Sequence, residues 1–301
     1  MSTKTPLKVA VLGPTGQCGS CVVDELLSRG HTVVGISRNP PKEWKGNERY
    51  SAVPVDIQDT EKLAKAFSAG FDAIVCAFSP SLSDLSTTYE NGVEGHGRIK
   101  TALLRSAHTG SFIIIGGAGS IHGSDGIQLV DRPDFAYSWW YNWPEVHLNY
   151  MRTRAYDHKS RGLGRFVTGF KWARANVQHP GWFSWMFRPF ALLYLRWAKS
   201  FLTHRHGRSL ITLSRMALTM WEGVKDKQWS FLSPPGLLRD KGVRTGQYQL
   251  HIDGEGSSGD AAIDGGIYNE DMAVAIVDEV ENKKLTFKHW SCTGKIGLKE
   301  W

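Results

Sequence analysis

Three glycines near the start of the chain have the spacing of a phosphate-binding turn. Gly13, Gly16 and Gly19 form a G-x-x-G-x-x-G pattern between an apolar run at residues 8–12 and a stretch with helical periodicity. Glycine suits these positions because the backbone must turn tightly and approach a pyrophosphate closely, with the first amides of the helix facing the phosphates. The flanking strand and helix make the pattern specific. The residues expected to hold a dinucleotide are Gly13, Thr15, Gly16, Gln17, Cys18 and Gly19.

The end of the second strand-like segment indicates which dinucleotide binds. A site for NAD places Asp or Glu there to accept hydrogen bonds from the ribose, whereas Ser37 and Arg38 stand here and the first carboxylate is Glu43. The guanidinium of Arg38, assisted by Ser37 and Lys42, suits a 2′-phosphate because its planar donors make charge-assisted hydrogen bonds and stack on adenine. The sequence therefore predicts NADP(H) as the cofactor.

Loops after the later strands are expected to complete the cofactor site. Asp56 and Ile57 follow the third strand, where such loops flank the adenine, and Ala77 and Phe78 follow the fourth, next to the expected ribose position. Gly117 belongs to a glycine run after the fifth strand. These assignments rest on position along the chain.

Ser120 and His122 are the leading candidates for proton chemistry. Ser120 follows the fifth strand at the carboxyl edge of the sheet, where reacting groups gather, and a hydroxyl there can donate to a substrate carbonyl. His122 can give or take a proton near neutral pH. The alternatives are a turn serine and a loop histidine bonded to the backbone. Further catalytic candidates are Tyr141 and Tyr150, and the expected substrate contacts are Ser120, His122, Asp131, Trp139, Trp140 and Trp143.

The elements that would position these residues follow an α/β alternation. A chain of 301 residues with 41% hydrophobic and 22% charged residues can bury a core, which excludes a disordered protein. We expect a Rossmann-type, doubly wound parallel sheet. Its predicted strands are residues 8–12, 32–36, 50–55, 71–78 and 111–115, and its predicted helices are residues 18–29, 61–67 and 92–107.

The rest of the chain divides into an insertion and a return to the sheet. We predict an NADP-binding Rossmann core at residues 1–135, an aromatic and basic helical insertion at 136–221, and a small C-terminal substrate region at 222–301. The expected C-terminal elements are strands at 228–232 and 285–289, a polar glycine-rich loop at 253–266 and a helix at 269–280.

Five stretches carry a resemblance to a known family, namely residues 13–19, 112–120, 128–135, 229–235 and 244–248. Together they resemble the atypical short-chain dehydrogenase/reductases, and most of all the NmrA-like and biliverdin-reductase-B-like NAD(P)H-binding proteins. The resemblance covers roughly residues 7–135 and 222–290. It implies a Rossmann domain with a small C-terminal substrate region, and it places Ser233 and Pro234 near the nicotinamide.

One departure from the wider superfamily bears on the chemistry. Ordinary members use a Tyr-x-x-x-Lys pair, in which the lysine lowers the pKa of the tyrosine so that it can exchange a proton with the substrate. No tyrosine here is followed four residues later by lysine, and the nearest match is Tyr150 with Arg154. The atypical branch commonly lacks the pair, and some NmrA-like members bind the nucleotide as sensors.

Three functions therefore stay open. The first is an NADPH-dependent reductase, or the reverse dehydrogenase, acting on a carbonyl, imine or conjugated double bond of a bulky, partly aromatic metabolite. The second is a cyclase or isomerase that retains NADP(H) as a structural cofactor. The third is a non-catalytic NADP sensor that binds a partner through the insertion.

The net positive charge of the chain comes from the insertion. Residues 136–221 contain 13 Lys and Arg against two acidic residues, Glu145 and Asp157, so their formal net charge is +11. Because the whole chain has a formal net charge of +7, the remaining residues have 7 − 11 = −4. The same segment contains eight of the 12 tryptophans. Because the basic residues alternate with large apolar ones that a folded protein mostly buries, and no recognition motif is present, we expect no nucleic-acid partner.

Three roles for the insertion compete. It can form the wall and lid of an apolar pocket for a ring-containing substrate. It can form a homodimer or partner interface, where Trp, Tyr and Arg are enriched. It can also lie on an anionic membrane surface, which we favour least. In that arrangement the inward residues are Trp182, Trp185, Phe187, Phe190 and Trp197, and the residues toward the headgroups are Arg188, Arg196, Lys199, Arg205 and Arg208.

The four cysteines do not form a disulfide framework. They stand at unevenly spaced positions, and no long apolar run or secretory signal accompanies them, so we expect a cytoplasmic protein in a reducing compartment. Cys18 and Cys21 form a C-x-x-C on the nucleotide helix, where we expect structural thiols. No group of His and Cys has zinc spacing, and we predict no metal site.

Overall fold

The computed structural model describes residues 5–81, 85–179, 181–204, 208–255 and 258–297, which form two compact units. The first contains the described residues among 1–80, 90–129 and 213–296, and the second contains those among 81–89 and 130–212, together with residue 297. No helix of the described residues is long and apolar enough to cross a membrane.

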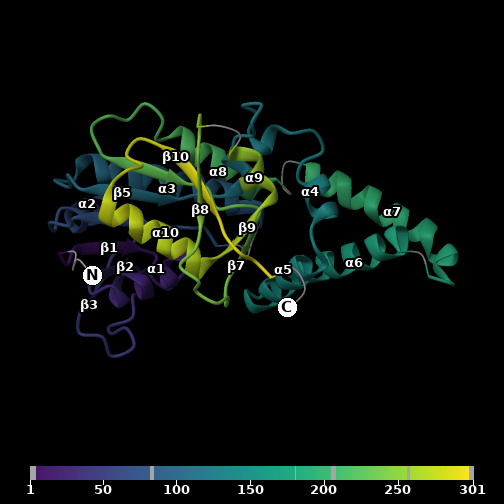
Figure 1. Ribbon diagram of the computed structural model, residues 1–301, viewed down its shortest axis with the longest axis horizontal. Coiled ribbons are helices and arrows are strands. Elements are labelled where there is room, and N and C mark those ends of the chain that lie inside the picture. Colours follow the sequence, from purple (N-terminus) through teal and green to yellow (C-terminus); the bar gives the residue numbers. More distant parts are fainter. Residues whose placement is uncertain (1–4, 82–84, 180, 205–207, 256–257, 298–301) are drawn as a thin grey trace. The chain divides into compact units, whose positions relative to one another are not determined.

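An eight-stranded sheet, with β1, β2 and β5 among its labelled strands in Figure 1, forms the centre of the first unit. The order of its strands is β3-β2-β1-β4-β5-β6-β10-β8. Each neighbouring pair is parallel except β10 and β8, which are antiparallel. This order has the Rossmann pattern and confirms the predicted fold class. The strands of this sheet are β1 (Lys8–Leu12), β2 (Thr32–Ser37), β3 (Tyr50–Pro54), β4 (Ala73–Cys76), β5 (Ser111–Ile115), β6 (Trp229–Leu232), β8 (Gln249–Ile252) and β10 (His289–Thr293).

Helices cover both faces of this sheet. Side chains alternate between the two faces along each strand, so Val9 and Val11 pack with α1 and α10, while Ala10 and Leu12 join the core formed with α2 and α3. The helices of this unit are α1 (Gln17–Ser28), α2 (Thr60–Phe67), α3 (Leu85–Arg105), α9 (Ser258–Asp264) and α10 (Asn269–Asn282). Two helices run from one unit into the other. Helix α3 and helix α8 (Ser209–Thr219) each have their first residues in the second unit and their later residues in the first.

The C-terminal segment differs from the sequence expectation in two places. The last strand is β10, beginning at His289, because the residues before it form a turn in which the amide of Phe287 donates to the carbonyl of Trp229. The stretch expected as a polar loop at 253–266 contains α9, and β9 (Gly266–Tyr268) pairs with β7 (Leu237–Arg239) in a small second sheet. Short polar stretches such as these lack the periodicity that identifies an element.

The second unit is helical and has an aromatic core. Trp140 and Trp143 are buried and lie in ring contact with one another, and Trp140 also contacts Phe166 and Phe170. Aromatic pairs of this kind add specific contact energy to their burial. The helices of the second unit are α4 (Tyr137–Asn142), α5 (Glu145–Asp157), α6 (Arg161–Gln178) and α7 (Ser184–Thr203). Short 3-10 turns lie at Ala118–Ser120, in the first unit, and at Leu129–Asp131, where the two units meet along the chain.

The buried face of α7 is narrower than the sequence suggests. The side chains that pack inward are small or aliphatic, namely Ala191, Leu195, Ala198 and Leu202. Phe183 and Phe190, which share a helical face with Ala191 by periodicity, are 64% and 66% exposed. The expectation that a folded protein buries the large apolar residues of this segment is therefore wrong for α7.

Candidate cofactor and proton-transfer site

The glycine turn has the shape that a pyrophosphate requires. Gly13 has a φ of +82°, in the left-handed region that glycine adopts without strain. A Cβ atom on Gly19 would lie 2.1 Å from the carbonyl oxygen of Gly13, so a side chain there would occupy the turn. Gly16 precedes α1 and no side chain caps that helix N-terminus, while Thr15 and Gly16 are exposed. These features fit a bound dinucleotide phosphate at the start of α1.

The C-terminal helix α10 fixes the position of α1. The side-chain Nδ2 of Asn269 donates to the carbonyl of Gln17 at 3.4 Å, and the thiol of Cys18 lies 3.8 Å from the Asn269 side-chain oxygen. At the other end of α1, Arg29 bonds to Asp278 at 2.6 Å. Sequence reasoning missed Asn269, because its partners lie some 250 residues away along the chain.

Cys21 behaves as a structural thiol in this environment. Burial and the nearby carboxylate of Glu270 raise the pKa of Cys21 to about 12. The thiol therefore stays protonated and unreactive at neutral pH. This supports the structural interpretation of the C-x-x-C pattern on α1.

Arg38 is free to meet a ligand. It follows Ser37 at the end of β2, is exposed, and makes no hydrogen bond or ion pair with the described part of the chain. Asp56, by contrast, caps its own turn by accepting from the amide of Gln58 at 3.0 Å. Ile57 and Phe78 are partly buried, and both lie against the position that a Cβ on Gly95 would occupy.

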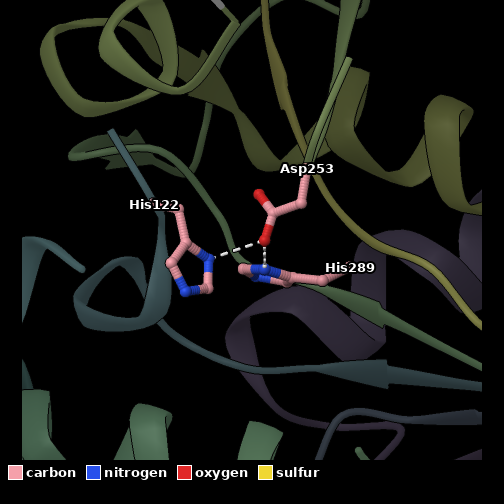
Figure 2. Close-up of side chains that lie close together, drawn as sticks. All are labelled: His122, Asp253 and His289. Atoms are coloured by element: carbon pink, nitrogen blue, oxygen red, sulfur yellow. Dashed lines mark hydrogen bonds and ion pairs between the residues drawn. The ribbon is translucent and has the colours of Figure 1, made fainter. Parts of the chain in front are cut away.

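A chain of hydrogen bonds crosses the carboxyl edge of the sheet. The hydroxyl of Ser120 bonds to that of Ser233 at 2.7 Å, and Ser233 bonds to Nε2 of His289 at 2.7 Å. Nδ1 of His289 lies 2.5 Å from Oδ2 of Asp253, and the same oxygen lies 2.6 Å from Nδ1 of His122 (Figure 2). Ser120 and His122 follow β5, Ser233 follows β6, Asp253 follows β8 and His289 begins β10. Four strands thus contribute to one array.

The Ser120 hydroxyl lies 2.9 Å from the carbonyl of Gly117 as well as 2.7 Å from the hydroxyl of Ser233. It carries a single proton, so it donates to one of these two acceptors at a time.

The two histidines hold Asp253 in its charged form. Partial burial opposes the charge, but hydrogen bonds from His122 and His289 outweigh burial and lower the pKa of Asp253 to about 2. The hydrogen bond to Asp253 in turn raises the pKa of His122, against the effect of burial. His122 therefore keeps a proton over a wider pH range than an isolated histidine does.

We expect the His122–Asp253 pair to stabilise the fold most at mildly acidic pH. The pKa of Asp253 is lowered, so its contribution is present above its unfolded value of about 3.9 and is lost as the pH falls toward 2. The pKa of His122 is raised, so its contribution is complete below about 6.5 and is lost as the pH rises through the folded value. The difference in unfolding free energy between wild type and His122→Gln should therefore shrink from about pH 5 to about pH 9. A constant difference over that range would contradict the pairing.

Two other chemistries share some of these residue types. One is hydrolysis by a Ser-His-Asp triad, since the hydrogen bonds run from Ser233 to His289 to Asp253 as in such a triad. Ser233 is 0% exposed, however, so no substrate reaches its hydroxyl. His122, Asp253 and His289 offer metal-ligand atoms within 4.8 Å of one another. Both Nδ1 atoms lie at hydrogen-bond distance from the same carboxylate oxygen, and a protonated nitrogen has no lone pair for a metal. The geometry supports an ion-pair array.

The remaining candidate residues belong to the second unit. Tyr150 is 2% exposed and its ring lies 5.8 Å from that of His147. Tyr141 stacks on Tyr137 with ring centroids 5.7 Å apart. Trp139 is partly exposed, whereas Trp140 and Trp143 serve the aromatic core, and Asp131 is exposed. Their assignment to catalysis or substrate binding stays a prediction.

Comparison with known proteins identifies the nucleotide-binding part. Residues 13–154 match a family model described as NAD(P)H-binding. The uncharacterised protein YwnB of Bacillus subtilis is 28% identical over 131 residues, which cover 43% of this chain and 57% of that protein. Cinnamoyl-CoA reductase 1 of Arabidopsis thaliana is 38% identical over 95 residues, which cover 29% of this chain and 27% of that enzyme. The chain thus spans about half of the first relative and about a quarter of the second.

A solved structure matches the chain over nearly its whole length. It is a Streptococcus pneumoniae protein described as a candidate NADH-flavin reductase, with 20% identity and a TM-score of 0.59 over 96% of this chain and 100% of that chain. At this identity the match shows the fold. Residues 13–154 thus carry the NAD(P)H-binding family match, and the fold and the glycine turn agree with the predicted resemblance to the atypical short-chain dehydrogenase/reductases and with a nicotinamide cofactor.

Proposed function

We propose that the chain is an NADPH-dependent reductase, or the reverse dehydrogenase, acting on a carbonyl, imine or conjugated double bond of a bulky, partly aromatic metabolite. The observation that carries this proposal is the hydrogen-bonded array from Ser120 to His122 at the carboxyl edge of the sheet, beside the loops that bind the cofactor in this fold. A reductase needs a proton source at that edge. A nucleotide sensor has no use for one.

His122 is the group that we assign to proton transfer. Its Nδ1 is held by Asp253, its side chain is 29% exposed, and its Nε2 has no partner in the described part of the chain. Asp253 therefore fixes the ring so that Nε2 is the atom that exchanges a proton with the substrate. When bound, the reduced cofactor supplies the hydride.

Ser120 has a different role from the one its position suggests. It is 0% exposed, and its hydroxyl bonds to the carbonyl of Gly117 and to Ser233. We therefore assign Ser120, Ser233 and His289 to positioning, because His289, bonded to Ser233, holds the same oxygen of Asp253 that binds His122. Substrate contact at this edge falls to His122.

One assay separates the three functions. The purified protein is incubated with NADPH and a panel of aromatic aldehydes, ketones, imines and enones, while cofactor oxidation is followed by absorbance and products by mass spectrometry. Cofactor consumption with a reduced product supports the reductase. Product without consumption indicates the cyclase or isomerase, and cofactor binding without any product indicates the sensor.

Arg38 tests the choice of NADP over NAD. Replacing Arg38 with Asp should weaken NADPH binding by about 10- to 100-fold, because a charge-assisted bond to the 2′-phosphate contributes roughly 1.5–3 kcal/mol. NADH, which lacks that phosphate, should bind the variant at least as well as wild type. Calorimetry with both coenzymes measures this, with Lys65→Asp as a control for the change in net charge. An unchanged NADPH affinity would place the 2′-phosphate site elsewhere.

A further inference from the structure

Helix α7 exposes apolar side chains that a folded domain ordinarily buries. On the helix and the turn before it, six large side chains are each more than half exposed. We call these residues the α7 face: Trp182, Phe183, Trp185, Phe190, Leu193 and Trp197. The opposite side of α7 packs inward through Ala191, Leu195, Ala198 and Leu202. A helix that is apolar on both sides has a second partner for its outer side.

The charged residues of α7 itself are all basic. No Asp or Glu stands between residues 158 and 221. Arg188 and Arg196 are exposed on α7 and make no hydrogen bond or ion pair with the described residues. Two carboxylates of this unit are engaged with other cations, since Glu145 pairs with Lys171 and Arg174 and Asp134 pairs with Lys199. Arg188 and Arg196 are therefore available to an anionic partner.

Two of the five cations expected at lipid headgroups are engaged within the protein. Lys199 lies 2.6 Å from Asp134, and Arg208 donates to the carbonyl of Val130. Arg205 lies outside the described residues. Arg188 and Arg196 are the two that remain available, and both lie on the helix that carries the exposed aromatic rings.

The exposed aromatic rings and the two available arginines of α7 favour an anionic bilayer over a second copy of this chain as the partner. A second copy of this chain would bring the same cations against one another, which costs energy. A bilayer with anionic lipids satisfies both sets at once, since tryptophan rings favour the interface and arginine stems reach from acyl chains to headgroups. Helix α7 is not apolar enough to span a bilayer, so it would lie in the interfacial plane.

We propose that the α7 face docks on membranes that contain anionic lipids, with Trp182, Trp185 and Phe190 inserted at the acyl boundary and Arg188 and Arg196 at the headgroups. This docking goes beyond the proposed reaction and does not depend on it. Both the apolar rings and the unpaired cations contribute to binding.

Vesicle co-sedimentation tests the proposal with the full-length chain. The protein should bind phosphatidylcholine vesicles that contain phosphatidylserine, bind pure phosphatidylcholine at least tenfold more weakly, and lose affinity as salt is added. Arg188→Gln with Arg196→Gln should weaken binding about 30-fold, because two basic residues near an anionic surface contribute about 1 kcal/mol each. Trp182→Ser with Trp185→Ser should weaken binding at least about tenfold.

Matched variants and a solution measurement complete the test. Lys65→Gln with Lys225→Gln removes two exposed charges from the first unit and should leave vesicle binding unchanged. All variants change exposed side chains, and their far-UV circular dichroism and thermal unfolding should match wild type. Equal binding to both kinds of vesicle, or no vesicle binding together with a dimer that the tryptophan variants dissociate, would overturn the proposal. The second result would assign the α7 face to a second copy.

Discussion

Replacing Asp253 with Asn is expected to lower kcat about 100-fold or more while the Kd for NADPH stays near that of wild type. The carboxylate accepts from Nδ1 of both His122 and His289, and a neutral amide can neither accept from both at full strength nor stabilise a charged imidazole. General acid catalysis contributes factors of about 10² to 10⁴, which sets the expected size. Steady-state kinetics and calorimetry with NADPH measure the two quantities.

The pKa of His122 shows whether Asp253→Asn acts through the histidine or only by damaging the fold. In Asp253→Asn the pKa of His122, followed by NMR of its ring protons, should fall from its raised position, and the pH profile of kcat should shift in the same direction. Asp260→Asn is the matched control, because Asp260 lies in α9 and bonds to Ser124 rather than to a histidine. An Asp253→Asn protein with the wild-type rate and pH profile would remove the array from the mechanism.

Placing a side chain on Gly19 should destabilise the fold and abolish nucleotide binding. The new Cβ would lie 2.1 Å from the carbonyl oxygen of Gly13, which is backbone and cannot swing away. We expect Gly19→Ala to lose about 2–3 kcal/mol of unfolding free energy, as overpacked sites do, and to bind NADPH at least 100-fold more weakly. Denaturant unfolding and calorimetry check both effects.

Two other glycines provide the comparison for Gly19. Gly97 lies in helix α3 with nothing within 4 Å of its Cβ position, so Gly97→Ala should keep NADPH affinity and gain about 0.5–1 kcal/mol of stability. At Gly16 the nearest atom is 3.3 Å away, so Gly16→Ala should fold and bind NADPH roughly tenfold more weakly, because its methyl group narrows the phosphate turn. Wild-type affinity in a folded Gly16→Ala or Gly19→Ala protein would exclude this turn as the site.

The sequence predicts the nucleotide half of the fold because its signals are local. The strand before Gly13 and the helix after Gly19 lie within a few residues of the motif, and the alternation continues to β5. The place of His122 after a strand also predicts its role. Each of these inferences needs only neighbours in the chain and the rules of a parallel sheet.

Local sequence signals cannot predict which residues form hydrogen bonds with His122. Asp253 lies 131 residues further on, in a stretch that reads as a polar loop, and His289 was expected at the end of a strand that it begins. Their meeting depends on β10 pairing in parallel with β6 and in antiparallel fashion with β8. The exposure of the α7 face also cannot be predicted from the sequence. Periodicity shows which residues share one side of a helix, but it does not show whether another element covers that side.

The order in which the strands are made also affects how the protein is produced. Strand β5 is buried throughout and ends at Ile115, yet its neighbour β6 begins only at Trp229. At translation speeds of about 5–20 residues per second, the ribosome needs roughly ten seconds to supply that neighbour. During this interval the nascent chain presents an apolar, unpaired edge, which is the kind of surface that chaperones bind and that aggregates recruit. Expression yield should therefore improve when elongation between these strands is fast.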